Sequence, residues 1–496
     1  MTLRHRFVTL LALSAGTASA LFAQAPAPSS APAPLTLEGC IQRALSRNFD
    51  LEIQRFNPQI AEEAVAAAHA EFDPTLTLTS TRTFTQQAGS LSALDGSAAP
   101  TSDTTTTRLA LSEKISSGAT VSLSTRLNRS ASNSSFSTLN PAFNADATVS
   151  VNQPLLKGAG AGITQATIKR NEIGFARAKL DFKARALDVI QSTENAYYNL
   201  VFAREQLEVR NFSLALANRL WEEAKTRRDT GVATDLDVLQ AEVGVANARR
   251  NVLLAQQSVK DREDALLALI GQFELDAPLG AASFAEFDGA LPLVASSVSQ
   301  ARLNQPDYLS TQAAIDQLKL DLNIAKNASL PSLNIGGALG YTGRQGSADA
   351  AYRQIPDRDG YTWQADLSLS VPIGFRGDKA RYRQSLATFN RETIRLRQIE
   401  QNIEVQVRSA VRAVETNLES VKISAQASQL SKRQYELEKA RFEAGLSTSR
   451  RVLESQNDLE TARVSELQSR VNLRTSLAAL HRIEGSSLQR YGVTLP

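Results

Sequence analysis

Two long stretches of the chain carry an apolar or small residue at every third or fourth position. The spacing averages about 3.5 residues, which is typical of helices in a coiled coil. Between Thr164 and Asp229 there is no proline and a single glycine, Gly174. We therefore expect a helix about 100 Å long, which must pack along its length against other helices. Only Arg210 interrupts the first of the two series, which are Val189, Thr193, Ala196, Leu200, Ala203, Leu207, Leu214, Ala217, Trp221, Ala224 and Leu396, Ile399, Ile403, Val407, Ala410, Val414, Leu418, Val421, Ala425, Ser428.

Shorter segments alternate apolar residues with small or polar ones, as in strands with one apolar and one water-facing side. We expect main strands at about 74–87, 145–154, 331–343 and 361–373. Leucines and a valine also flank Ser116-Ser117-Gly118. These residues predict an additional β-hairpin over 105–128, between the first two main strands, with a surface loop as the alternative.

The order of these elements occurs twice. Pro74 and Pro331 precede the first strand of each half, and Gly231 and Gly445 stand 214 residues apart. Landmarks repeated in the same order predict an internal duplication. The expected first repeat is 35–271, with helices at about 37–72 and 160–271 and a tip at 229–235. An equatorial linker, 272–294, leads to the second repeat, 295–485, with helices at about 295–329 and 376–485, a tip at 443–449 and a C-terminal tail at 486–496.

A glycine ends the first long helix of each pair. Gly231 and Gly445 fit the position just after a helix, where a positive φ costs glycine little. Thr234 then begins the next helix, and Asp237 resembles the acidic partner of a capping box. In the second copy Ser447 or Thr448 can cap, but basic residues follow. Each glycine turn therefore predicts a helical hairpin.

The N-terminus has a short basic stretch, about ten mostly apolar residues and then small residues. This pattern predicts a secretory signal peptide over 1–23, followed by a Pro/Ala linker at 24–34. Cys40 lies too far from the apolar run to favour a lipid anchor. No later run approaches the ~18 to 20 apolar residues of a membrane-spanning helix, so an exported chain would enter a membrane only as strands.

Four main strands are too few to close a transmembrane barrel, because bacterial barrels begin at about eight strands. Open strand edges are not tolerated in lipid. Either the strands are soluble, or several chains share one barrel. Three chains would supply about 12 strands, with the polar face lining the lumen.

Composition and motifs narrow the chemistry further. Lys and Arg total 54 against 51 Asp and Glu, a near-neutral balance that does not favour a nucleic-acid partner. Three His, one Cys and one Met do not favour a Cys/His metal site and exclude an intrachain disulfide. The glycines at 158, 160 and 162 lack dinucleotide-loop spacing, and no P-loop or hydrolase motif is present. We expect no catalytic residue, cofactor or metal, and therefore no enzyme.

The chain resembles the TolC-like outer-membrane efflux family, also called outer membrane factors or channel-tunnels. The resemblance is carried by Leu35-Thr36-Leu37-Glu38 with Ala44-Leu45, by the Pro74 and Pro331 strand entries, and by the two glycine tips, each with a Val-Leu pair seven residues further on, at 238–239 and 452–453. It implies an α+β membrane protein in which duplicated helix–strand–long-helix units form a homotrimer. That trimer would share a 12-stranded barrel in outer-membrane lipid and extend a helical coiled-coil barrel into the periplasm.

The same resemblance implies the channel-tunnel component of a tripartite efflux or type I secretion system. Such a component passively conducts drugs, ions or proteins from an inner-membrane RND or ABC transporter, which it meets through a periplasmic adaptor. By resemblance, the adaptor-contacting tip residues are Arg227, Gly231, Val232, Arg441, Gly445 and Leu446.

The resemblance also places a periplasmic gate at Asp237, Arg451 and Glu454. Arg451 departs from the best-known member of the family, in which an acidic residue is usual there, and it could form inter-chain ion pairs that hold the tip shut. The alternative is that these are solvated charges on a helix surface.

A different class of protein also fits part of the pattern, namely a secreted coiled-coil structural or adhesive stalk without transport activity. The duplication favours the duct, because strands interrupt the helices at two equivalent places. The sequence does not indicate the cargo.

Overall fold

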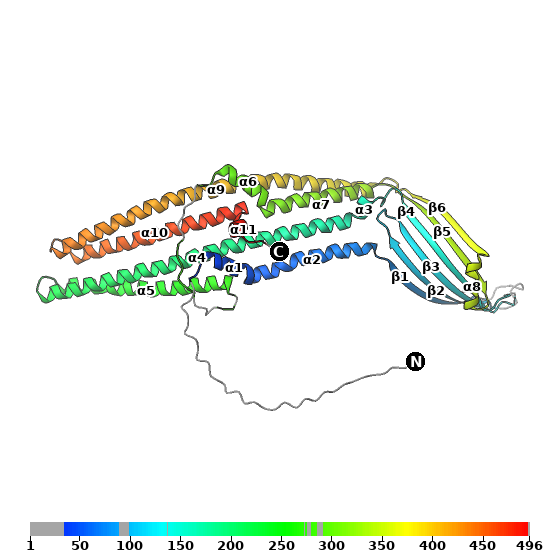
Figure 1. The fold of residues 1–496 in the computed structure, drawn as a ribbon, viewed down its shortest axis with the longest axis horizontal. Helices are drawn as coiled ribbons and strands as arrows, with labels where there is room; N and C mark the ends of the chain where they lie inside the picture. Colours follow the sequence, from blue (N-terminus) through cyan, green and yellow to red (C-terminus); the bar gives the residue numbers. More distant parts are fainter. Residues whose placement is uncertain are drawn as a thin grey trace, which may run out of the picture.

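The computed structural model describes residues 34–88, 99–135, 137–271, 273–274, 279–284 and 291–494. The predicted signal peptide at 1–23 and nearly all of the linker at 24–34 lie outside this part of the chain. Figure 1 shows an elongated molecule, with a β-sheet at one end and two helical hairpins at the other.

The hairpins consist of four long helices. α4 (Ala166–Asp229) and α9 (Arg376–Glu443) have 64 and 68 residues, so each is about 100 Å long. After the tips, α5 (Asp235–Ile270) and α10 (Ser449–Glu484) return antiparallel to them. α10 also packs on α4, which places the two hairpins side by side. No helix in the described part of the chain combines the length and the apolar character needed to cross a membrane.

Shorter helices connect the middle of the molecule to the sheet. The single helices expected over 37–72 and 295–329 are each broken in the structure. The first becomes α1 (Leu37–Arg47), α2 (Phe49–His69) and the 3-10 turn η1 (Ala70–Phe72), and the second becomes α6 (Val294–Asn304) and α7 (Pro306–Ala328). At the first break, Asn48 is extended and its side chain accepts hydrogen bonds from the amides of Asp50 and Leu51. At the second, Pro306 starts the new helix, because proline has no amide hydrogen to donate within a helix.

The sheet has six strands in sequence order, all antiparallel to their neighbours. They are β1 (Thr75–Gln86), β2 (Thr101–Lys114), β3 (Thr120–Ser132), β4 (Ala142–Pro154), β5 (Ser332–Gln345) and β6 (Gly360–Ser370). The hairpin expected over 105–128 is therefore β2–β3, and it lies within the sheet rather than forming a surface loop. The sheet of one chain therefore contains the four expected main strands and, between the first two of them, both strands of the expected hairpin.

Helices that the sequence pattern did not indicate are short. α8 (Ala348–Gln354) and the 3-10 turn η2 (Ile355–Asp357) join β5 to β6, and α3 (Ala161–Thr164) precedes α4. α8 packs closely on the sheet, since a Cβ at Gly343 would approach the carbonyl oxygen of Ala351 to 2.1 Å. α11 (Ser487–Arg490) ends the described fold beside α4 and α10.

The largest apolar cores lie midway along the molecule, one for each repeat. The first joins α1, α4 and α5 through side chains that include Ile41, Leu187, Ile190 and Ile270. The second joins α6, α9 and α10, and includes Ile403, Val407 and Leu480. On the sheet side of these cores, α4 also packs on α2 and α9 on α7, whereas towards the tips the described parts of the long helices pack on one another, so local contacts hold the hairpin tips.

Candidate functional site

The two hairpin tips share one turn geometry. Gly231 and Gly445 have φ of +76° and +73°, and neither would meet any atom within 4 Å on gaining a Cβ. The amide of Val232 donates to the carbonyl of Arg227, and the amide of Leu446 donates to that of Arg441, each at 2.8 Å. The side chains of Val232 and Leu446 remain 75% and 72% exposed. Each tip therefore presents an apolar side chain to the surroundings.

The helices that follow the two tips begin differently. Thr234 and Asp237 form a reciprocal capping box at the start of α5. The amide and hydroxyl of Thr234 donate to Asp237 Oδ2 at 2.9 and 2.7 Å, and these hydrogen bonds hold the pKa of Asp237 below its usual value. At the start of α10, the Thr448 side chain makes no capping hydrogen bond. The residue equivalent to Asp237 is Arg451, which cannot accept one.

The tips of the two repeats touch each other within one chain. The guanidinium of Arg227 lies over the ring of Phe442 and also pairs with Glu223 at 2.8 Å. Phe442 is buried in a small cluster with Leu220 and Val452. These contacts fix the spacing between the first and second hairpins at the end of the molecule.

The structure places Asp237 beside the start of α10, the helix that carries the other two predicted gate residues, Arg451 and Glu454. Ser449 at the start of α10 donates to Asp237 Oδ1 at 3.4 Å, so Asp237 lies between the two tips. Glu454 pairs with Arg450 at 3.0 Å, one helical turn away, and not with Arg451. Arg451 is exposed, as is Glu454. Asp237 therefore already serves as a helix cap, whereas Arg451 and Glu454 face outward from α10.

At the opposite end of the molecule, the sheet has two contrasting faces. One cross-strand row consists of Leu76, Leu111, Leu123, Val149, Leu339 and Trp363, one from each strand and all exposed. The next row, on the other face, consists of Thr75, Ser112, Ser122, Ser150, Ala338 and Gln364. The sheet thus separates an apolar surface from a small, polar one.

Comparison with protein families identifies this architecture. The sequence model of the outer membrane efflux proteins matches residues 117–272 and 297–486, one segment in each repeat. The chain belongs to the outer membrane efflux protein family.

Individual members of the family are distant relatives. The pyoverdine export outer membrane protein OpmQ of Pseudomonas putida is 25% identical over 316 residues, which cover 63% of this chain. The chain matches 65% of the length of that relative, slightly less than two thirds.

Solved structures of outer membrane channels have the same fold. The CmeC channel of Campylobacter jejuni superimposes with a TM-score of 0.67 at 18% identity, covering 91% of this chain and 85% of CmeC. The MtrE channel of Neisseria gonorrhoeae, solved in an open state, gives 0.65 at 18% identity, with coverages of 91% and 89%. The resemblance to the efflux family seen in the sequence is confirmed, and the chain has the channel-tunnel fold.

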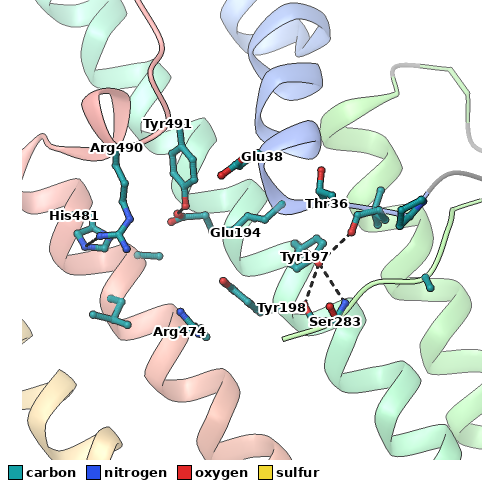
Figure 2. Close-up of a pocket in the computed structure, with 16 residues that line it drawn as sticks. Thr36, Glu38, Glu194, Tyr197, Tyr198, Ser283, Arg474, His481, Arg490 and Tyr491 are labelled. Carbon is teal, nitrogen blue, oxygen red and sulfur yellow. Dashed lines mark hydrogen bonds between the residues drawn. The ribbon is translucent and has the colours of Figure 1, made fainter. Parts of the chain in front are cut away.

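Sequence reasoning missed a polar cavity of about 550 Å³ in the middle of this efflux-family protein (Figure 2). Residues from α1, α4, α10 and the C-terminal tail line it. The Tyr491 hydroxyl donates to Glu194 Oε1, across 297 positions of sequence. The other carboxylate oxygen of Glu194 is buried and has no hydrogen-bond partner in the structure. The repeat pattern gave no signal for this pair, because Tyr491 lies in the tail, outside the duplication.

Burial controls the ionisation of the groups around this cavity. It raises the pKa of Glu194 to about 6, although the Tyr491 hydroxyl and Arg490 oppose the shift. It lowers the pKa of His481 to about 4, and the adjacent Arg490 guanidinium acts in the same direction. Arg490 Nη1 lies 2.9 Å from His481 Nε2, so the neutral ring accepts that hydrogen bond. The cavity walls therefore hold two groups that titrate near or below neutral pH.

Proposed function

We propose that this protein is the outer-membrane duct of a tripartite export system. Three copies form a homotrimer, in which the sheets together enclose a pore in the outer membrane. The helices continue that pore into the periplasm as a tunnel. Cargo enters from an inner-membrane RND or ABC transporter and passes outward passively, without catalysis by this chain.

The two-faced sheet is the observation that carries this proposal. An apolar outer face suits lipid, and a face of threonine, serine and glycine suits a water-filled lumen. β1 has 12 residues and β6 has 11, close to the ~9 to 11 that a tilted strand needs to cross a membrane. In the described sheet both of these strands pair on one side only. Since unpaired edges are costly in lipid, neighbouring copies must supply the missing partners.

The long helices support a tunnel that extends away from the membrane. A helix of about 100 Å can carry a pore far into the periplasm. At its far end, Val232 and Leu446 are exposed apolar side chains on otherwise polar turns. We assign the adaptor contact to these tips, with Arg227, Gly231, Arg441 and Gly445 shaping the two turns.

The periplasmic gate is assigned to the same end of the tunnel. Asp237 lies between the two tips, and Arg451 and Glu454 are exposed on the first turns of α10. In a trimer, exposed charges at these positions can meet those of the next copy. Ion pairs between copies would narrow the entrance and neutralise its charge.

The names of relatives favour export over a purely structural role. OpmQ is named for pyoverdine export, and OprJ and TolC are named outer membrane proteins. A secreted stalk would need neither a continuous apolar sheet face nor two open edge strands of nearly the same length, 12 and 11 residues.

Cell fractionation with bilayer recording tests the proposal. The full-length protein is expected in the outer-membrane fraction, as a trimer after detergent extraction, and it should form ion-conducting channels in planar lipid bilayers. Recovery as a soluble periplasmic monomer that conducts no ions would favour the stalk and overturn the duct.

Site-directed crosslinking tests the tip assignment. The chain has one cysteine, Cys40, and it is buried, so an introduced exposed cysteine can be modified selectively. Val232→Cys and Leu446→Cys should crosslink to the adaptor, whereas Leu254→Cys, exposed on α5 away from the tip turn, should not. Equal crosslinking at all three positions would contradict the assignment.

A further inference from the structure

The β2–β3 hairpin adds two strands to the four main strands expected for each chain. It lies in the middle of the sheet, where β2 pairs with β1 over 12 residue pairs and β3 pairs with β4 over 11. Its turn is tight, with the Ile115 amide donating to the Ala119 carbonyl at 2.8 Å and Gly118 at φ +94°. The hairpin is therefore a full part of the wall and not an appendage at its edge.

The hairpin also carries the same division between faces as the rest of the sheet. Leu109, Leu111 and Leu123 stand on the apolar face and are exposed. Ser122 and Arg126 stand on the polar face, where Arg126 pairs with Asp146 of β4 at 2.6 Å. Each hairpin thus adds one strand pair that could contact lipid outside and water inside.

The sheet edges allow identical copies to join. With six strands, all antiparallel, β1 and β6 run in opposite directions, so β6 of one copy can pair antiparallel with β1 of the next. The apolar face reaches both edges, with Leu76 on β1 and Trp363 on β6 exposed. The occupant that fits each edge is a second copy of this chain.

We propose that the sheets of three copies close into an 18-stranded β-barrel in the outer membrane. The lumen of this barrel would admit bulkier hydrated cargo than the lumen of a 12-stranded barrel. This inference rests on the trimer of the proposed function. Barrel diameter grows roughly in proportion to strand number, so 18 strands give a diameter about 1.5 times that of 12. Barrels of about 16 to 18 strands leave an open aqueous channel. The hairpin is therefore the element that sets the width of the outer pore.

The topology allows the hairpin to be removed cleanly. β1 and β3 run in the same direction, so β4 is antiparallel to β1 as well as to β3. Deletion of Thr101–Ser132 would bring β1 next to β4 and leave four strands per chain. In planar bilayers, neutral polyethylene glycols added on the side opposite the tips should enter the full-length channel up to a given radius. That limiting radius should fall by about one third in the deletion variant.

A second experiment keeps the inference testable if the deletion variant does not fold. Ser122 and Leu123 are neighbours on opposite faces of β3, which makes them a matched pair. In lipid nanodiscs, a water-soluble thiol reagent should modify Ser122→Cys rapidly and Leu123→Cys at least tenfold more slowly, because lipid covers the apolar face. Buried Cys40 contributes little background.

The outcomes separate this inference from the duct itself. Suppose that the trimers conduct ions but the thiol reagent modifies the cysteines at positions 122 and 123 at equal rates. The hairpin would then lie outside the barrel, which would overturn this inference but not the proposed function. A conducting assembly of two chains, with 12 strands in all, would also overturn it. A protein that neither assembles nor conducts would overturn the proposed function.

Discussion

The guanidinium carbon of Arg227 lies 4.1 Å from the centroid of the Phe442 ring. Arg227 lies in the last turn of α4 and Phe442 in the last turn of α9, so this contact ties the two hairpins of one chain together next to their tips. Arg227 is largely buried, and a cation–π contact in such a setting contributes about 1–2 kcal/mol.

Phe442→Leu removes the ring but keeps an apolar side chain in the cluster. We expect the tips to lose about 1–3 kcal/mol of local stability, from the lost cation–π contact and the smaller side chain. Amide hydrogen exchange at 225–235 and 441–450 should accelerate at least several-fold, and the channel should open more often. Phe212→Leu is the matched control, because it also removes a ring that an arginine covers. Arg463 of α10 lies 4.7 Å from the Phe212 ring of α4, at a distance from the tips. Equal acceleration at the tips in both variants would contradict the role of Arg227 and Phe442.

Alanine at two glycines should change stability in opposite directions. Gly231→Ala places a side chain at φ +76° and should cost about 1–2 kcal/mol, although no atom crowds the new Cβ. Gly174→Ala, in the interior of α4 with equally open surroundings, should stabilise by about 0.5–1 kcal/mol. Thermal unfolding of the solubilised protein, followed by its helical circular dichroism, measures both. The same sign of change in both variants would argue against the assigned turn.

The charges on α10 should control ion passage at the tunnel entrance. Arg451→Ala should raise conductance and cation preference about twofold, and Glu454→Ala should lower cation preference, with both effects weakening as salt screens the charges. Arg408→Ala removes an exposed arginine much farther along α9 and should leave both properties unchanged. Single-channel recordings decide the point. If neither α10 variant differs from the unmodified channel, the gate is elsewhere.

Glu194 makes stability depend on pH. Its folded-state pKa, about 6, exceeds the usual 4.5. Its favourable contribution to the stability of the folded state is therefore present below pH 4.5 and is lost as pH rises through 6. The difference corresponds to about 2 kcal/mol. Glu194→Gln should therefore gain up to that amount of stability relative to the unmodified protein between pH 4.5 and 7.5. Unfolding midpoints at the two pH values measure this.

In the unmodified protein, the ionisation of His481 changes stability with pH in the opposite direction to that of Glu194. Its pKa is lowered to about 4, so its contribution is present above the usual 6.5 and is lost as the solution becomes more acidic. With Gln at position 194, this loss is no longer offset, and stability should fall more steeply with acid. A flat profile in Glu194→Gln would mean that His481 does not titrate as described.

Local sequence signals anticipated the long helices and both tips. The apolar spacing from Val189 to Ala224 and the glycines at 231 and 445 correspond to α4 and to two turns with positive φ. These features depend on residues within one or two turns of each other. The strand alternation also contained the β2–β3 hairpin, but whether such a hairpin lies over a sheet or within it depends on pairing with distant strands.

The features that could not be predicted from the sequence depend on contacts between residues far apart in the chain. The pairing of Tyr491 with Glu194 and of Arg227 with Phe442 arises because helices far apart in the chain pack side by side. The repeat offset relates equivalent positions of the two copies, but no spacing pattern predicts which residues more than 200 positions apart come into contact.

The difference between Asp237 and Arg451 gives the two halves of the duplication unequal ends. The first half starts its return helix with a reciprocal pair of hydrogen bonds, and the second half does not. In a ring of three chains, turns followed by a capped helix would alternate with turns followed by an uncapped helix around the periplasmic entrance of the tunnel. If three copies form the proposed ring, opening would require only every other turn to unwind, so its free energy would depend on three of the six turns.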